Sequence, residues 1–456
     1  MKKICCHIFC ILAAALQLHA QELGLKDCLE MAERNCVTVK NAGLDVLSAE
    51  FRLKEARWER YPSASINALS YKAMDPLLKI TLHDVLGNSD RANELNEELS
   101  ARARENGIKP YYSSFADGWS LGLSAVQPVY AGGRIRAGNK LAALNVDAKK
   151  IQASIVLRDC RDSVERKYWR IVEMQEKEKT AEGALRLLDT LCKDLGSATD
   201  AGLATQHELM QLKLKRNEMA AARRRLANGI RLLKMDLLTD IGCPFEFLKL
   251  DDIRLCDTLP CLPAPAEVIA DESSLPGFDE SRLLALRTEA GRLEKKMGVG
   301  ELLPQFSIGG AYGYGSMSAA GNGKFNGLVF ASLQVPVTGL GKAAQRSKRL
   351  QTEIMKSLNE QETYDAKLML QMRMLAMEIE NAWDDMSTAA EAVRIAEDWM
   401  SAMRRNYAAG RCTGAQLMQA ETELMQASDA LNSARTSYRN ALNSYTKHLN
   451  TTTKQP

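Results

Sequence analysis

The sequence predicts a mainly α-helical protein with a small membrane β part, built as two tandem repeats of a β-hairpin followed by long coiled-coil helices. Three observations support this fold class. Long segments rich in Ala, Leu, Met, Glu, Gln, Lys and Arg hold almost no glycine or proline, which is typical of long helices. Short segments that alternate apolar and small residues interrupt them. Both kinds of segment recur 208 positions later, as from Gly202 to Gly410.

Residues 128–210 align at this offset with residues 336–418 without an insertion. The matched pairs are Pro128 with Pro336, Gly133 with Gly341, Gly202 with Gly410, Thr205 with Thr413, Leu209 with Leu417, and Met210 with Met418. We therefore expect a first repeat over residues 21–242, with a helix, a β-hairpin at 61–130 and a helical hairpin at 133–242. The expected second repeat is 279–450, with its β-hairpin at 304–337 and its helical hairpin at 341–450. A linker, 243–278, joins the repeats, and a tail, 451–456, follows them.

The first 20 residues are typical of a secretory signal peptide. They contain Lys2 and Lys3, an apolar run and a small residue, Ala20, before Gln21. Cys10 lacks the small residues that usually precede a lipidated cysteine, so lipidation is not expected. After residue 20 no apolar run approaches the ~18 residues of a membrane-spanning helix. The sequence therefore predicts export, and entry into a membrane would have to use strands.

The charges nearly balance, with 60 Lys and Arg against 57 Asp and Glu, and two of the lysines belong to the signal peptide. This balance gives no basic patch, so a nucleic-acid partner is not expected. The five histidines never cluster and no cysteine pair has zinc-ligand spacing, so neither a metal nor another cofactor is expected. Of the eight cysteines beyond the signal, Cys256 and Cys261 lie close enough to form a disulfide; eight free thiols is the alternative.

Three segments show the alternation of membrane β-strands. In "WSLGLSAVQPVY", Trp119, Leu121, Leu123 and Ala125 alternate with Ser120, Gly122 and Ser124. In "SIGGAYGYG", Ile308, Tyr312 and Tyr314 alternate with Ser307, Gly309, Ala311 and Gly313. In "GLVFASLQVPV", Val329, Ala331, Leu333 and Val335 alternate with Phe330, Ser332 and Gln334, and Phe330 breaks the polar face. Strands near ten residues with one apolar face suit a membrane barrel, and a soluble two-hairpin sheet is the alternative.

The helical segments are unusually long. From Gly133 to about Leu195, and from Gly341 to about Tyr407, there is no proline and hardly a glycine. At 1.5 Å per residue each helix would be roughly 90 to 100 Å long. The second one carries an apolar stripe at spacings of three, four and seven: Leu368, Met372, Leu375, Ile379, Trp383, Met386, Val393 and Met400. Such a stripe predicts a packing seam with a partner helix.

The partner helix is expected to begin beyond Gly410. Its seam repeats every seven residues as Leu417, Leu424, Leu431, Tyr438 and Tyr445, with Ala420, Ala427, Ala434 and Ala441 three positions after the first four. This pattern predicts a left-handed supercoil with closely spaced backbones. The first repeat has Arg216 and Arg223 at two of its seam positions, and we expect them at the edge of the seam or in an aqueous interior.

Between the strands of the first hairpin, an excursion from about Lys72 to Asp117 contains "DRANELNEELSARARENG", which predicts a short charged helix. No segment predicts catalysis. "AGGRIRAGNK" lacks the Gly-Lys-Ser/Thr of a phosphate-binding loop, and "GGAYGYG" has no βαβ unit around it. Asp384 and Asp385 point in different directions on a helix. We therefore expect no enzymatic activity.

The combination of these parts resembles the TolC family of outer-membrane efflux proteins over about Leu23 to Asn450. The junctions "QPVYAGGR" and "VPVTGLGK" are similar to those of the family. The segment "NYAAGRCTGAQLMQAETELMQASDALNSARTSYRNALNSY", with Tyr-x-x-Gly-x-x-Thr followed by the Leu-x-x-Ala rhythm, is the most specific. Four strands cannot close a barrel, since small closed barrels need about eight, so the strands require other copies of the chain.

The resemblance implies a homotrimer with a 12-stranded β-barrel in the outer membrane and an α-barrel in the periplasm. It implies a passive conduit from the periplasm to the exterior, for efflux or type I secretion. A periplasmic adaptor protein would connect it to an inner-membrane transporter of the RND or ABC type. The main alternative is a secreted or periplasmic coiled-coil scaffold without a pore, against which the strand hairpins argue.

The resemblance also assigns the repeated turns to the periplasmic tip. The adaptor-docking residues would be Gly202, Leu203, Thr205, Gly410, Arg411 and Thr413. Glycine suits a tight turn with positive φ, and threonine suits a helix N-cap. The best-known family member has two aspartates and an arginine at the gate, where this chain has Gln416, Gln419 and Cys412. Glu208, which is equivalent to Gln416 in the first repeat, is the nearest candidate for an acidic ring.

Overall fold

A computed structural model describes residues 22–74, 78–87, 89–108, 111–114, 117–202, 204–243, 254–255, 262–269, 278–316, 323–336 and 339–449. The chain divides into two compact units. Unit 1 contains Met1–Ser48, Val146–Arg287 and Ser357–Pro456, and unit 2 contains Ala49–Asn145 and Thr288–Lys356. Each unit therefore draws segments from both halves of the sequence. The predicted signal peptide, the Cys256–Cys261 pair and the tail 451–456 lie outside the described residues.

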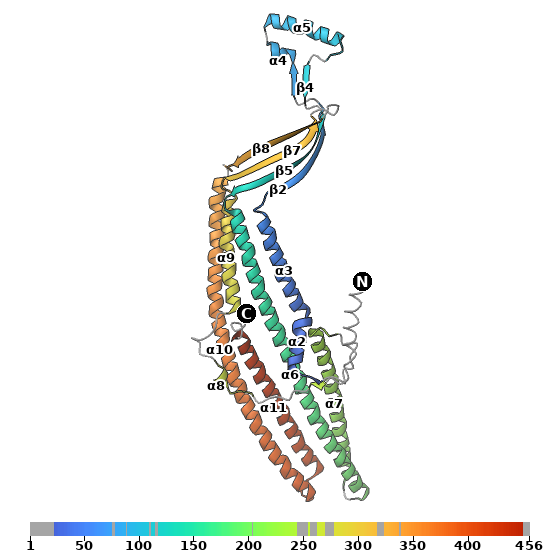
Figure 1. Cartoon of the computed structure of the whole chain (residues 1–456). Coiled ribbons are helices and arrows are strands. Elements are labelled where there is room, and N and C mark those ends of the chain that lie inside the picture. Colours follow the sequence, from blue (N-terminus) through green and yellow to red (C-terminus); the bar gives the residue numbers. More distant parts are fainter. Residues whose placement is uncertain are drawn as a thin grey trace. The chain divides into compact units, whose positions relative to one another are not determined.

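Unit 2 contains an antiparallel four-stranded sheet in the order β2–β5–β7–β8 (Figure 1). The strands are β2 (Ser63–Lys72), β5 (Asp117–Ala131), β7 (Gln305–Ser316) and β8 (Lys324–Gln334). The central pair, β5 with β7, joins the first half of the sequence to the second. Among the described residues, β2 pairs only with β5 and β8 only with β7, so both edges of the sheet are open.

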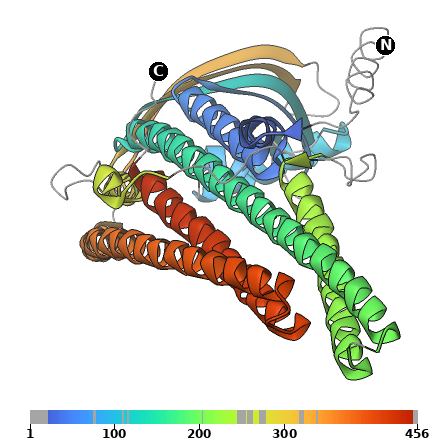
Figure 2. The ribbon, with the colours of Figure 1, turned by 90° about the horizontal axis from the view of Figure 1, so that it is seen from below.

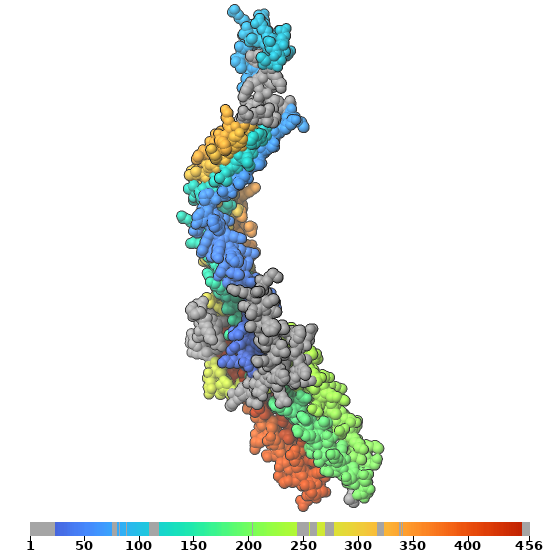
Figure 3. All heavy atoms as spheres, turned by 45° about the vertical axis from the view of Figure 1, so that its right-hand side comes forward, coloured from blue at the N-terminus to red at the C-terminus, as the bar shows by residue number. Residues whose placement is uncertain are grey.

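The strand register gives the sheet two chemically different faces. One row across the sheet reads Ile66, Leu123, Tyr312 and Gly327, and the next row reads Asn67, Gly122, Gly313 and Asn326. Because successive residues of a strand point to opposite faces, the apolar residues separate from the small or polar ones along β5 and β7. On β2 and β8 the second face also carries Leu69, Leu328 and Phe330. The predicted alternation is confirmed. The apolar face is exposed at Ile66, Leu121, Leu123, Tyr312, Val329 and Leu333. Strands of the sheet lie at the surface in the space-filling view (Figure 3).

The excursion between β2 and β5 is structured. It consists of β3 (Leu78–Thr81), α4 (Leu82–Leu86), α5 (Asp90–Glu105) and β4 (Tyr111–Ser114), with β3 and β4 paired antiparallel. The predicted charged helix is therefore present as α5. It buries none of its residues, as its charged sequence indicates. The corresponding connection between β7 and β8, residues 317–322, lies outside the described residues.

The N-terminal helical run is divided in two. α2 (Leu25–Asn35) and α3 (Val37–Trp58) are separated at Cys36, where ψ is 125° and the backbone leaves the helical region. The sequence predicted one run from about Leu23 to Arg60, because no proline or glycine marks this break. Ahead of α2, the two-residue strand β1 (Glu22–Leu23) pairs in parallel with β6 (Arg254–Leu255).

Two helical hairpins form most of unit 1. The first pairs α6 (Arg134–Asp200) with α7 (Gln206–Asp240), and the second pairs α10 (Gly339–Ala408) with α11 (Gly414–Leu449). In each hairpin the two helices run antiparallel and side by side (Figures 1 and 2). The remaining helices are α8 (Pro265–Val268) and α9 (Asp279–Gly300). Among the described residues, no helix is long and apolar enough to cross a membrane.

The predicted seam of the second hairpin is confirmed. Leu368, Met372 and Ile379 of α10 are buried in one cluster with residues of α11, among them Tyr438, Ala441 and Tyr445. In the first hairpin, α2, α6 and α7 share a core that includes Cys28, Ala32, Val164, Tyr168, Ile230 and Leu237.

Arg216 and Arg223 lie at the edge of the first seam, as expected. Arg216 Nε is 2.5 Å from Asp189 Oδ1, and Arg223 Nη2 is 4.0 Å from Glu182 Oε1. Both arginines are partly exposed and pair with carboxylates of α6, so their charges stay solvated while they hold the two helices together.

Candidate functional site

The first predicted site is the turn between α6 and α7. Gly202 has φ of 75°, the left-handed region that favours glycine, and its N–H donates to the carbonyl of Thr199 at 3.0 Å. Thr205 then caps α7, since its side chain accepts from the backbone N–H of Glu208. Leu203, predicted to dock an adaptor, lies outside the described residues.

The second predicted site is the turn between α10 and α11. Gly410 has φ of 69°. Its N–H donates to the carbonyl of Tyr407 at 2.9 Å, and the N–H of Arg411 donates to the carbonyl of Asn406 at 2.8 Å. These two bonds form a Schellman motif, which satisfies the last carbonyls of α10. Gly410 and Arg411 are exposed, as are Gly202 and Thr205 of the first turn, so both turns are accessible to a partner.

Glu208 and Gln416 perform the same local task in the two turns. Glu208 Oε2 accepts from the N–H of Thr205 at 3.4 Å and from its hydroxyl at 3.0 Å. Gln416 Oε1 accepts from the N–H of Thr413 at 3.0 Å, and the N–H of Gln416 donates to Thr413 Oγ1 at 3.3 Å. Each pair is a capping box, the reciprocal hydrogen bonding of an N-cap residue and the residue three positions later. The spacings Thr205 to Glu208 and Thr413 to Gln416 carry this signal in the sequence.

A single hydrophobic cluster supports both turns. Leu188 and Leu191 of α6, Leu212 of α7, Met400 of α10, and Leu417, Met418 and Ala420 of α11 are buried together. A Cβ atom on Gly414 would lie 3.4 Å from Leu212 Cδ1, so the first turn of α11 packs directly on α7. The two hairpins are thus held together close to their turns, whereas Gln419, the third predicted gate residue, remains exposed.

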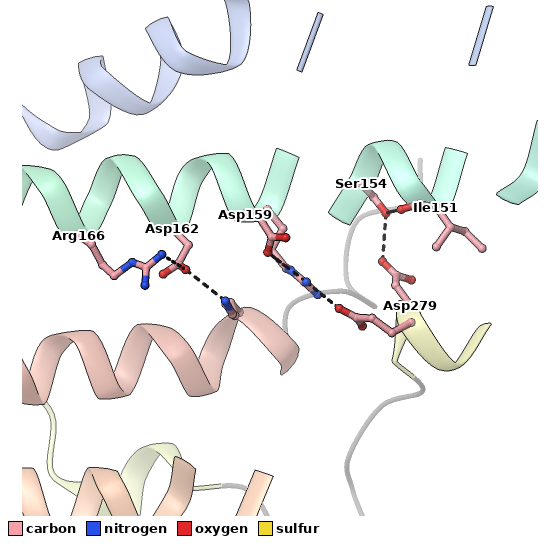
Figure 4. Close-up of polar contacts among 9 residues, drawn as sticks. Ile151, Ser154, Asp159, Asp162, Arg166 and Asp279 are labelled. Atoms are coloured by element: carbon pink, nitrogen blue, oxygen red, sulfur yellow. Dashed lines mark hydrogen bonds and ion pairs between the residues drawn. The ribbon is translucent and has the colours of Figure 1, made fainter. Parts of the chain in front are cut away.

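A buried polar cluster in unit 1 was not predicted from the sequence. Arg158 Nη2 lies 2.7 Å from Glu280 Oε1 of α9, and Lys447 Nζ of α11 lies 3.2 Å from Asp162 Oδ2 (Figure 4). Ser154 Oγ donates to Asp279 Oδ2 at 3.1 Å. The cluster borders a cavity of about 270 Å³. The partners of each of these three pairs are more than 100 positions apart in the sequence, and local sequence patterns carry no signal for such pairs.

The ion pair with Arg158 favours the ionised form of Glu280. Burial acts to raise the pKa of Glu280, but the hydrogen bond and the positive charge of Arg158 outweigh burial, and the pKa is lowered. Nearby, burial and the charge of Arg158 lower the pKa of His448. The cluster therefore fastens α6 to the start of α9 and the end of α11 by charge. Among the described residues, no group of three or more His, Cys, Asp and Glu could hold a metal ion.

The family described as outer membrane efflux protein matches residues 285–451. The family resemblance predicted from the sequence is confirmed. This efflux-family segment covers most of α9, the strands β7 and β8, and both helices of the second hairpin. A comparison with curated protein sequences found no match.

Solved structures share the fold of nearly the whole chain. The outer-membrane channel OprN is similar with a TM-score of 0.72 and 15% identity, covering 93% of this chain and 89% of that chain. The outer membrane channel CmeC of Campylobacter jejuni is similar with a TM-score of 0.75 and 13% identity, covering 93% of this chain and 85% of that chain. The outer membrane protein VceC of Vibrio cholerae is similar with a TM-score of 0.71 and 15% identity, covering 93% of this chain and 95% of that chain. At these identities the likeness concerns the fold.

Proposed function

We propose that the chain is one protomer of a trimeric outer-membrane channel, a passive conduit from the periplasm to the exterior. An inner-membrane pump of the RND or ABC type would drive export through it by way of a periplasmic adaptor. The observation that carries this proposal is the four-stranded sheet, which has two open edges and two chemically different faces.

The sheet is incomplete in one chain. Open edges expose unpaired backbone groups, and four strands are too few to close on themselves. Three copies, with β8 of one pairing with β2 of the next, would give twelve strands and no edge. The face with Leu121 and Leu123 would meet lipid, and the face with Ser120 and Ser124 would line a water-filled lumen.

The helical hairpins supply the periplasmic part of the proposal. Their exposed turns, with Gly202, Thr205, Gly410, Arg411 and Thr413, would dock the adaptor, and Glu208, Gln416 and Gln419 would line the pore at this end. The two-repeat organisation, residues 21–242 and 279–450, belongs to the same proposal, since each repeat would contribute one hairpin and one turn to a ring. Similar proteins are named as outer-membrane channels, among them MtrE of Neisseria gonorrhoeae, described in an open state.

A scaffold without a pore is not favoured. Val329 is 86% exposed and Ile66 76% exposed in the single chain, and both lie on the apolar face of the sheet. In a soluble scaffold this face would meet water, at a free-energy cost that lipid removes.

A pair of lysine substitutions tests the proposal. Leu121 and Ser120 are neighbours on β5, both exposed, and point to opposite faces. A lysine on the lipid face costs ~2–4 kcal/mol at the bilayer midplane, whereas a lysine in the lumen is tolerated. We expect Ser120→Lys to be recovered from the outer membrane as a trimer, and Leu121→Lys to be lost from it. The channel proposal would be rejected if both variants were recovered equally from the soluble periplasm. It would also be rejected if the protein were a monomer in mild detergent.

A further inference from the structure

We propose that Cys36 and Cys160 are joined by a disulfide bond in the exported protein, fastening α2 to α6. The proposal depends on the proposed function in one respect only, namely that these residues reach an oxidising compartment outside the cytoplasm.

The side chains of Cys36 and Cys160 are neighbours, and both are free thiols in the structure. Cys36 and Cys160 are hydrogen-bond partners through their side chains. Cys36 is buried at the break between α2 and α3, where the backbone is not helical, and Cys160 lies within α6. Thr38 Oγ1 is 3.1 Å from the Cys36 Sγ atom and holds this side chain in place. A sulfur–sulfur bond would therefore join two side chains that already interact through a hydrogen bond.

The packing around the pair fixes the distance between the two helices. On one side, Arg161 Nε donates to Glu33 Oε1 at 2.6 Å, so the residue after Cys160 is paired with α2. On the other side, a Cβ atom on Gly242 would lie 2.9 Å from the carbonyl oxygen of Asn35. One turn and two turns before Cys36, Ala32 and Cys28 are buried in the same core as residues of α6 and α7. The thiols are thus held together by contacts that do not involve sulfur.

The two thiols differ in pKa, and this difference decides which of them reacts first in thiol–disulfide exchange. Burial acts to raise the pKa of Cys36, but hydrogen bonds from Thr38 and Cys160 outweigh it and the pKa is lowered. Burial raises the pKa of Cys160 to about 12. Cys36 is therefore the thiolate that attacks first, because the thiolate is the reactive form.

The oxidant is a disulfide-bonded thiol oxidoreductase of the compartment. The Cys36 thiolate attacks one sulfur of its disulfide, forms a mixed disulfide and releases one oxidant thiolate. Cys160 transfers its proton to that thiolate and attacks the Cys36 sulfur of the mixed disulfide. The second oxidant sulfur leaves as a thiolate and takes up the proton that Cys36 lost. Two thiols of the chain are oxidised to a disulfide, and the oxidant's disulfide is reduced to two thiols.

Peptide mapping tests the bond directly. The protein is taken from the membrane fraction without reductant, its free thiols are blocked with N-ethylmaleimide, and it is digested with trypsin. We expect the fragment 35–40, "NCVTVK", to be linked to the fragment 159–161, "DCR", and the link to disappear on reduction. Cys192 and Cys412, which lie elsewhere on α6 and in the second turn, are expected as blocked thiols. Recovery of blocked Cys36 and Cys160, or of Cys36 linked to another cysteine, would overturn the proposal.

A second measurement separates the ability of Cys36 and Cys160 to form the bond from the compartment in which the protein is found. In cells without the periplasmic thiol oxidant, both cysteines should be recovered as blocked thiols, and incubation of that protein with oxidised glutathione should restore the link. Cys36→Ser should leave Cys160 blocked under both conditions. If the protein is not found in the membrane fraction, the proposed function fails, but the glutathione reaction still decides whether the pair closes. Failure of the link to form with glutathione would reject the disulfide even if the channel is confirmed.

Discussion

The ring of Phe330 on β8 lies over Gly309 on β7. The two residues are directly opposite in the register, and a Cβ atom at position 309 would come within 2.5 Å of the Cζ atom of Phe330. This contact gives the aromatic ring of Phe330 a packing site on the face of the sheet that carries Ser120, Gly122 and Ser124. The ring covers backbone that Gly309 leaves bare, and it is only 38% exposed.

Gly309→Ala should destabilise the sheet, because the methyl group displaces the Phe330 ring. Overpacking of this kind costs ~1–3 kcal/mol, measurable as a lower melting temperature of the assembled protein. Gly310→Ala is the matched control, since its nearest neighbour is 3.6 Å away. The double variant Gly309→Ala/Phe330→Leu should recover most of the loss. Equal effects of the two alanine variants would show that the ring contact does not matter.

Gly410→Val should impair export while leaving the trimer intact. Position 410 has φ of 69°, and a β-branched residue there is strained by ~1–2 kcal/mol or more, which shifts the turn. Space is not the reason, because nothing lies within 4 Å of a Cβ at this position. Gly410→Asn is the control, since asparagine tolerates the left-handed region. Substrate export and native mass measure the two outcomes, and unchanged export with valine would exclude the turn from adaptor docking.

Glu208→Gln separates a gating role from a capping role. Gln416 shows that an amide oxygen can close the capping box, so the substitution should cost at most ~0.5 kcal/mol, while Glu208→Ala should cost ~1 kcal/mol. If Glu208 forms an acidic ring, Glu208→Gln should reduce cation selectivity, measured as the reversal potential across a bilayer in a salt gradient. An unchanged reversal potential would leave Glu208 with the capping role alone.

Glu280→Ala should destabilise unit 1 by about 2 kcal/mol, because it removes the less exposed of the two carboxylate partners of the Arg158 guanidinium, which is only 14% exposed. Glu360→Ala is the matched control. It breaks an ion pair with Arg287 in which both side chains are more than half exposed, and it should cost less than ~1 kcal/mol. Denaturant unfolding of the detergent-solubilised protein compares the two. A smaller effect at Glu280 than at Glu360 would contradict the role of the buried cluster.

The same carboxylate predicts a pH dependence. The pKa of Glu280 is lowered from 4.5, so the fold favours its ionised form. Its stabilising contribution is complete above about pH 4.5 and is lost as the pH falls through the lowered value. The melting temperature of the wild type should therefore fall more steeply below pH 4.5 than that of Glu280→Gln. If the melting temperatures of the two proteins fell in parallel with pH, the ion pair with Arg158 would not stabilise the ionised form of Glu280.

Local patterns determined much of the fold. The long helices, the charged helix α5, the seam of α10 and α11, and the two faces of the strands all depend on residues within one or two turns, or within one strand, of each other. Thr205 and Thr413 were recognised as N-caps for the same reason. The division of the N-terminal run at Cys36 was not predicted, because neither residue type nor periodicity changes there.

The sequence by itself thus predicted the long helices, the hairpins of the four-stranded sheet and the positions of the two turns. The tertiary structure decided which distant residues meet: β5 with β7, Arg158 with Glu280, and Cys36 with Cys160. It also showed that the ring of Phe330 lies over Gly309. The physical reason is that periodicity records only which face of an element is apolar. The partner on that face, and the distance at which two charges or two thiols are held, depend on how the elements pack.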